Sequence, residues 1–348
     1  MKIRLSKLKI TLIVLILGVF IFLGIKGGLL FLDNKFSNFE NECVLLVYPE
    51  TPDSEVFTMI AESANPKYLS SLKRAFKKED VANRLKPGRY IIKPEHTSIF
   101  VARMLVAGWQ TPGNLTLSGT IRTKEAIAQK ISRCMMVDSV QVMSAITNNE
   151  FLSKYGVDTL SLFSIILPDT YEMYWTDSVE QIFDRLKIEH DKFWTQSRKD
   201  RANEMGYTPF EITVLASIVR GESLVAAEYP MIAGAYLNRL RIGMKLQADP
   251  TIAFIHGYKI NRILRVHLKK ESPFNTYKYL GLPPAPINSP SKVCIDAVLN
   301  HAKHNYIYFC ANPNFDGTHL FASSYSQHLR NARKFHKALN ARLKEQKK

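Results

Sequence analysis

The stretch that decides the fold of the larger part of this chain is Thr208–Ser223, with the sequence TPFEITVLASIVRGES. It opens with a capping box, because Thr208 can accept a hydrogen bond from the amide of Glu211 while Glu211 reaches back to the amide of Thr208. Pro209 stands at the first helical position, where its missing N–H costs nothing. These features predict a helix that begins at residue 209.

The apolar residues of this helix recur with a spacing that places them on one face. They are Ile212, Leu215, Ile218 and Val219. Glu222 falls on the same face, and burial there would raise its pKa because burial disfavours the charged form. A carboxylic acid that is still protonated near neutral pH is suited to act as a general acid that protonates a glycosidic oxygen. The alternative is that the helix ends near Gly221 and solvent surrounds Glu222; spacing alone leaves both interpretations open.

The chain has 348 residues, of which 46% are hydrophobic, and a net charge of +16. This length suffices for one large or two modest domains. Charge is concentrated at the ends, since residues 1–9 carry four basic side chains and no acid, and residues 329–348 carry eight against Glu345. The rest of the chain therefore holds only +5. A nucleic-acid groove needs a basic stripe within the fold, so we expect no nucleic-acid partner.

The sequence gives little sign of a metal centre. Its four cysteines are Cys43, Cys134, Cys294 and Cys310. None forms a Cys-x-x-Cys pair, so a zinc site is not expected, and whether they form disulfides is left open. His301 and His304 have a spacing that two metal ligands can use, but no third ligand accompanies them. We expect surface histidines, no metal and no cofactor.

Residues Ile10–Leu32 form an apolar run interrupted only by Lys26. As a helix this run would be roughly 34 Å long, enough to cross a bilayer. The basic residues before it predict a cytoplasmic N-terminus. A cleaved signal peptide is the competing interpretation, but no small-x-small cleavage site follows. We expect a retained single-pass anchor in the inner (cytoplasmic) membrane, with residues 33–348 outside the cytoplasm.

The segment after this run predicts a small α/β subdomain. Asp33–Asn41 is polar and is expected to be a short linker. Strand, helix, helix and strand patterns then follow between residues 43 and 93. This order is similar to that of the carbohydrate-binding LysM module, and a generic α+β subdomain is the alternative. Together with the patterns in the rest of the chain, this order predicts an α+β protein. It would consist of a transmembrane helix, a LysM-like subdomain and a larger mixed α+β catalytic domain.

Three local features complete the expectations for the larger domain. Leu167–Tyr171 is expected to be a turn, because Pro168 forces the residue before it out of the helical region. Asp249 before Pro250 is expected to cap a helix. The residues from Gln327 onward predict a basic helix with its apolar side facing inward.

Seven short motifs occur in one order between residues 167 and 321. They are LPDTY (167–171), LASIVRGE (215–222), NRL (238–240), LQADPT (246–251), NTY (275–277), GLPPAPI (281–287) and GTHLF (317–321). Following a membrane anchor and a LysM-like segment, this ordered set resembles the YceG-like endolytic murein transglycosylase family. We therefore divide the chain into 1–32 (N-terminus and anchor), 33–110 (linker and LysM-like subdomain) and 111–348 (YceG-like catalytic domain).

The resemblance implies that Glu222 is the catalytic acid/base of a lytic transglycosylase that cleaves nascent peptidoglycan strands between MurNAc and GlcNAc. The residue would protonate the glycosidic oxygen and then deprotonate the 6-hydroxyl of MurNAc. The resulting 1,6-anhydroMurNAc ends would terminate strand elongation. Gln247, Asp249, Asn275 and Tyr277 match motif positions and are candidate substrate-binding residues. The implied partners are peptidoglycan glycan strands and the cell-wall synthesis machinery.

The sequence departs from the family pattern in two places. Relatives often carry an acid where Arg220 stands, and Glu-Gly where Phe163 and Ser164 stand. Both departures cast doubt on a second carboxylate. Two other functions remain open: a membrane-anchored glycan-binding protein without activity, which would tolerate loss of Glu222, and a peptidoglycan hydrolase. A hydrolase would need a second carboxylate about 5–5.5 Å (retaining) or about 6.5–9.5 Å (inverting) from Glu222.

Overall fold

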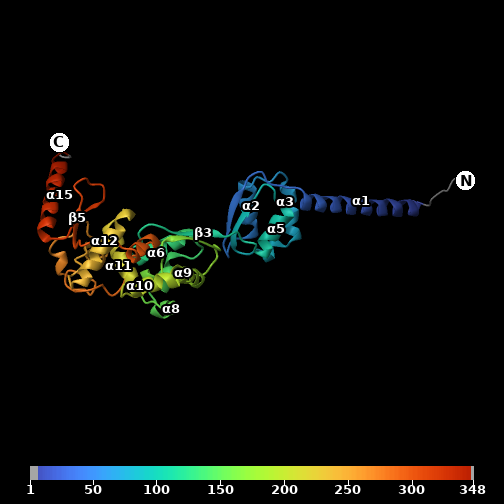
Figure 1. Ribbon diagram of the computed structural model, residues 1–348. Helices are drawn as coiled ribbons and strands as arrows, with labels where there is room; N and C mark the ends of the chain where they lie inside the picture. Colours follow the sequence, from blue (N-terminus) through green and yellow to red (C-terminus); the bar gives the residue numbers. More distant parts are fainter. Residues whose placement is uncertain (1–6, 346–348) are drawn as a thin grey trace. The chain divides into compact units, whose positions relative to one another are not determined.

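The computed structural model describes residues 7–345, which fold into two compact units (Figure 1). The first unit extends to Gly113 and takes in Glu172–Thr176; the second comprises Asn114–Tyr171 and the chain from Asp177 onward. Helices dominate both units, and the strands form three separate two-stranded sheets. The expected α+β class is confirmed.

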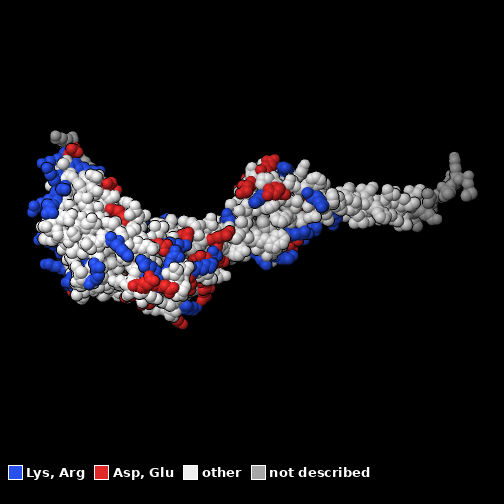
Figure 2. Space-filling model, in the orientation of Figure 1, with Lys and Arg blue, Asp and Glu red and all other residues white. Residues whose placement is uncertain are grey.

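Helix α1 spans Lys7–Lys35 and includes the one stretch in the described part of the chain that is long and apolar enough to cross a membrane, Ile10–Lys35. Its mean hydropathy is 2.5, and none of its most apolar 18-residue window is buried within the protein. Figure 2 shows α1 as a rod nearly free of charged side chains. A membrane anchor and a signal sequence share these properties.

The rest of the first unit is a two-stranded sheet covered by helices. The elements are β1 (Cys43–Val47), α2 (Asp53–Ser63), α3 (Leu69–Lys78), α4 (Val81–Arg84), β2 (Gly88–Ile92) and α5 (Ser98–Ala107). The strands are antiparallel, with Cys43 opposite Ile92. Alternate strand side chains, among them Val47 and Tyr90, are buried in the unit's core. The predicted order of strand, helix, helix and strand is present, while the LysM assignment stays a prediction.

The prediction that Asp33–Asn41 is a short linker is wrong. Helix α1 continues to Lys35, and Asp33 is 3% exposed in an ion pair with Arg74 of α3. Asn38 is also buried, and its amide donates to Tyr68 O at 3.0 Å and to Ser98 Oγ at 2.8 Å. The polar residues satisfy buried partners instead of facing water, so polarity alone misidentified the segment.

A sheet of β3 (Gly113–Leu117) and β4 (Asp169–Met173), most of whose residues belong to the second unit, comes next, and the other elements of this unit up to residue 204 are helical. The helical elements up to residue 204 are α6 (Lys124–Cys134), α7 (Ser139–Ile146), α8 (Asn149–Ser153), η1 (Leu162–Ser164), α9 (Val179–Phe193) and α10 (Gln196–Glu204). The prediction of a turn over Leu167–Tyr171 is wrong for its second half, because Asp169 opens strand β4. Pro168 precedes the strand, where its missing donor is tolerated.

The core of the second unit surrounds α11 (Pro209–Glu222). The elements packed around it or following it are η2 (Ala226–Glu228), α12 (Tyr229–Arg241), α13 (Asp249–Ile255), η3 (His267–Lys269) and α14 (Lys292–Leu299). The expected apolar stripe of α11 is buried, but so is every residue from Ile212 to Val219. A helix enclosed on all sides fixes the position of its last residue more firmly than an amphipathic surface helix would.

The chain ends with a hairpin and a basic helix. Strand β5 (Tyr308–Ala311) pairs antiparallel with β6 (His319–Ala322), and α15 spans Tyr325–Glu345. Figure 2 shows basic side chains along α15. The expectation of an inward apolar side is wrong for Leu329 and Leu343, which are 37% and 47% exposed, and no residue of α15 is buried.

Candidate active site

Glu222 is the last residue of α11, and the helix begins at the predicted capping box. The amide of Glu211 donates to Thr208 Oγ1 at 3.2 Å, and Glu211 Oε2 accepts from the amide of Thr208 at 2.8 Å. The helix ends where Ser223 adopts an extended backbone with φ of −135°. The helix thus continues one residue beyond Gly221, and Glu222 is placed by helical geometry.

The carboxyl group of Glu222 contacts Tyr236, a buried residue of α12 whose hydroxyl donates to Glu222 Oε1. Burial is the largest influence on this carboxyl and raises its pKa from 4.5 to about 7. The negative charge of Asp249 adds to the rise, while the hydrogen bond from Tyr236 and the charge of Arg239 oppose it. A group with such a pKa is present in both protonation states at neutral pH, as an acid/base catalyst requires.

Asp249 and Tyr277 form a second polar pair beside Glu222. Asp249 is exposed at the first residue of α13, and Tyr277 donates to its Oδ1 at 2.5 Å. Burial and the neighbouring carboxylates raise the pKa of the Tyr277 hydroxyl, which therefore stays protonated. Ala248, not Asp249, occupies the capping position of α13, so the predicted capping role is wrong. The carboxylate of Asp249 is thus free to take part in the site.

Gly221 allows α13 to approach the end of α11. A Cβ atom at this position would lie 2.5 Å from Cβ and 2.9 Å from Cγ of Pro250, well inside van der Waals contact. Pro250 directly follows Asp249 in the chain. The absence of a side chain at Gly221 therefore sets how closely Asp249 comes to Glu222.

Gln247 precedes α13 in a left-handed backbone conformation, with φ of 48°. Its amide donates to the carbonyl of Thr276 at 3.1 Å, and the amide of Ala248 donates to Thr276 Oγ1 at 2.9 Å. The side chain of Gln247 is exposed. These backbone bonds join the 246–251 motif to the 275–277 motif and leave the side-chain amide of Gln247 available to a ligand.

Asn275 lies in the loop that carries Tyr277, but it is fully buried. Its Nδ2 donates to the carbonyls of Leu268 at 3.0 Å and Lys270 at 2.7 Å, and its Oδ1 accepts from the amide of Tyr277 at 3.0 Å. The side chain amide is thus occupied by the backbone. Of the four predicted substrate-binding residues, the structure places Asp249 and Tyr277 together near Glu222, Gln247 on the adjoining surface, and Asn275 beneath them.

Two residues of α12 belong to the site although the sequence analysis did not select them. Tyr236 belongs to none of the seven motifs, and Arg239 appears only within the NRL motif. Arg239 is 8% exposed, and it donates from Nε to Ile307 O at 2.6 Å and from Nη1 to Leu246 O. It therefore secures the start of the loop that carries Gln247. A buried arginine in a motif was the available signal.

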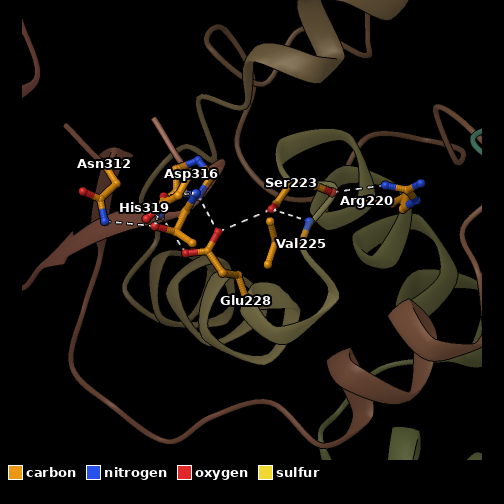
Figure 3. Close-up of polar contacts among 8 residues, drawn as sticks. Arg220, Ser223, Val225, Glu228, Asn312, Asp316 and His319 are labelled. Carbon is orange, nitrogen blue, oxygen red and sulfur yellow. Dashed lines mark hydrogen bonds and ion pairs between the residues drawn. The ribbon is translucent and has the colours of Figure 1, made fainter. Parts of the chain in front are cut away.

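A polar network holds the chain immediately after Glu222 (Figure 3). Arg220 Nη1 donates to Ser223 O at 3.2 Å, and Ser223 Oγ contacts Glu228 Oε2 at 3.4 Å. Glu228 Oε1 accepts from the backbone amide of His319 at 2.7 Å, while its Oε2 lies 2.8 Å from Nδ1 of the same residue. Arg220, where relatives often have an acid, thus acts on the backbone. The network links the end of α11 to strand β6.

Within residues 7–345, no group of three or more His, Cys, Asp or Glu side chains is arranged to hold a metal ion. His304 Nε2 instead lies 3.0 Å from the carbonyl of Met231. All four cysteines are free thiols in the structure.

Comparison with known proteins identifies relatives of this arrangement. The model of the YceG-like family matches residues 50–334. An endolytic murein transglycosylase of Bacillus subtilis is 28% identical over 170 residues, which cover 49% of this chain and 47% of that protein. One from Streptococcus pneumoniae serotype 2 is 28% identical over 171 residues, which cover 48% of this chain and 31% of that protein. The match thus spans less than half the length of either relative.

A solved structure shows the same fold. The crystal structure of a putative YceG-like protein from Listeria monocytogenes superposes with a TM-score of 0.57 at 23% sequence identity. The comparison covers 83% of this chain and 98% of that one. At this identity the likeness establishes the fold and leaves the chemistry to the residues of the site.

Proposed function

Because the chain belongs to the YceG-like family, we propose that it is an endolytic peptidoglycan lytic transglycosylase, with Glu222 as its single catalytic acid/base. The observation that carries the proposal is the placement of this carboxyl group at the end of a helix whose central residues, Ile212 to Val219, are all buried, with a pKa of about 7. Endolytic murein transglycosylases among its relatives supply independent support.

The proposed reaction needs one group that first gives and then takes a proton. Protonated Glu222 donates to the oxygen that links MurNAc C1 to GlcNAc, and the C1–O bond breaks as GlcNAc leaves with that proton. The carboxylate then accepts the proton of the MurNAc 6-hydroxyl as the oxygen of that hydroxyl bonds to C1. The product is a 1,6-anhydroMurNAc end, no water is consumed, and Glu222 is again protonated.

The neighbouring residues fit supporting roles in this reaction. The hydroxyl of Tyr236 orients the carboxyl of Glu222 and stabilises its ionised form, which is needed in the second step. Asp249 opposes ionisation and so favours the acid needed in the first step. We assign direct substrate contacts to Gln247, Asp249 and Tyr277, and we assign Asn275 to holding the loop that presents Tyr277.

The location we propose follows from α1. Helix α1 is retained as a single-pass anchor in the cytoplasmic membrane. Both units then lie on the outer side, where nascent strands and the cell-wall synthesis machinery are found. The first unit would hold glycan through its LysM-like arrangement of strands and helices. Deleting residues 43–93 should then weaken binding of isolated glycan strands while leaving Glu222 in place; unchanged affinity would contradict this role.

A peptidoglycan hydrolase is the second candidate, and Asp249 is the observation in its favour. This carboxylate is close enough to Glu222 to raise its pKa, so it is the natural second group for activating water. Cleavage of purified strands in ¹⁸O-labelled water separates the two. A lytic transglycosylase yields anhydro ends without label, whereas a hydrolase yields labelled reducing ends; a glycan-binding protein without activity yields neither.

A further inference from the structure

The end of α1 is joined to α3 by an ion pair whose carboxylate is buried and whose guanidinium is partly exposed. Arg74 of α3 donates to Asp33 through Nε at 2.8 Å and through Nη2 at 2.6 Å. This bidentate pairing lowers the pKa of Asp33 despite its burial, so the carboxyl stays ionised. The anchor and α3 are therefore held in one fixed relation where the span ends.

A pocket of about 610 Å³ lies at this junction. Its apolar wall comes from α1 and the residues just after it, with Leu29, Leu32 and Phe36. Its polar wall comes from Lys67, from the ion pair of Arg74 with Asp33 and from neutral polar side chains between them. A cavity with one apolar and one cationic wall fits an amphiphile that carries a negative charge.

The position of the pocket along α1 matches the surface of a bilayer. Twenty helical residues from Ile10 to Leu29 span about 30 Å, the thickness of the hydrocarbon core. The next six residues, which include Asp33 and Lys35, then extend about 9 Å into the headgroup region. Phe36 and Tyr68 are 61% and 68% exposed beside the pocket, and aromatic residues favour this depth.

The net positive charge of the pocket comes from Lys67. The charge of Arg74 is balanced by Asp33, whereas Lys67 is exposed and has no ion-pair partner among residues 7–345. A phosphate group at this point would face Lys67 and the remaining N–H groups of Arg74, while an acyl chain would lie along Leu29 and Leu32.

We propose that this pocket binds one anionic phospholipid, with its phosphate at Lys67 and its acyl chain against α1. The proposal rests on the retained anchor of the proposed function, but not on the chemistry of Glu222. Bound lipid would hold the first unit at the membrane surface at a fixed height.

The test is native mass spectrometry of the full chain in detergent, titrated with phosphatidylglycerol or phosphatidylcholine. The wild type should bind one phosphatidylglycerol about fivefold more tightly than phosphatidylcholine, as expected for one unbalanced cation. Lys67→Ala should abolish the preference. Lys77→Ala is the matched control, because Lys77 lies on α3, the helix that follows Lys67 in the chain, but lines a different cavity.

Several results would overturn the proposal: no preference in the wild type, an equal loss in both variants, or a membrane-purified chain whose intact mass shows that α1 has been removed. Cleavage of purified glycan strands is measured in parallel. An active Lys67→Ala protein without lipid preference supports the pocket, whereas an inactive wild type that keeps the preference contradicts the proposed function alone.

Discussion

Replacing Glu222 by glutamine should make the stability of the second unit less dependent on pH. The folded state raises the pKa of Glu222 from 4.5 to about 7, so folding favours the protonated form. Below pH 4.5 the residue costs nothing; the cost grows as pH rises from 4.5 to 7 and is constant above that. The interval between the two values corresponds to about 3 kcal/mol in the free energy of unfolding.

Glutamine avoids this cost because it carries no charge, is nearly isosteric and can still accept the hydrogen bond from Tyr236. Thermal unfolding of the full chain in detergent measures the effect. At pH 8, Glu222→Gln should raise the midpoint of the second unit's transition by about 6–12 °C over wild type. At pH 4.5 the two midpoints should agree within about 2 °C. Glu204→Gln, at an exposed position of α10, is the control and should show no pH-dependent difference.

Equal midpoints for wild type and Glu222→Gln at both pH values would refute the reasoning, because they would mean that the carboxylate is hydrated in the folded protein. A lower midpoint for the variant at pH 8 would refute it too. In that case the ionised form makes favourable contacts that outweigh burial, and Glu222 would be a poor proton donor at neutral pH.

Two further predictions concern the geometry around Glu222. Tyr236→Phe removes a hydrogen bond that lowers the pKa of Glu222, so the alkaline fall in the pH–rate profile should move to higher pH. Asp249→Asn removes a like charge, so the same alkaline fall should move to lower pH. Shifts of both variants in the same direction would contradict these assignments. Gly221→Ala places a methyl group 2.5 Å from Pro250 Cβ and should destabilise the second unit by about 1–3 kcal/mol in denaturant titration while reducing cleavage; an unchanged protein would show that α13 moves away freely.

The parts of the site that lie close together in sequence could be predicted, because local rules govern them. The capping box at Thr208, the helix through Glu222 and the apolar stripe between them all depend on spacing along one helix. Tyr236 was not selected, since it reaches Glu222 from α12, and the packing of two helices decides which of its side chains faces the carboxyl.

Residues whose polarity suggested exposure were the least predictable. Asp33 and Asn38 were predicted to lie in a linker, yet both are buried and bond to residues 41 and 60 positions away along the chain. Asn275 seemed suited to bind substrate, but backbone carbonyls of its own loop occupy its amide. In each case the partner comes from the fold, and the residue type alone does not distinguish a ligand in solution from a carbonyl in the core.

The most direct test of the central claim is the yield of 1,6-anhydroMurNAc ends from uncrosslinked glycan strands, measured by mass spectrometry for wild type and Glu222→Gln side by side. General acid–base assistance contributes about 10²–10⁴-fold per role, and Glu222 is assigned both roles. The wild type should therefore produce anhydro ends within the strands, and the folded variant should produce none above background. Anhydro ends from Glu222→Gln at a rate near that of the wild type would contradict the assignment of Glu222 as the catalytic acid/base.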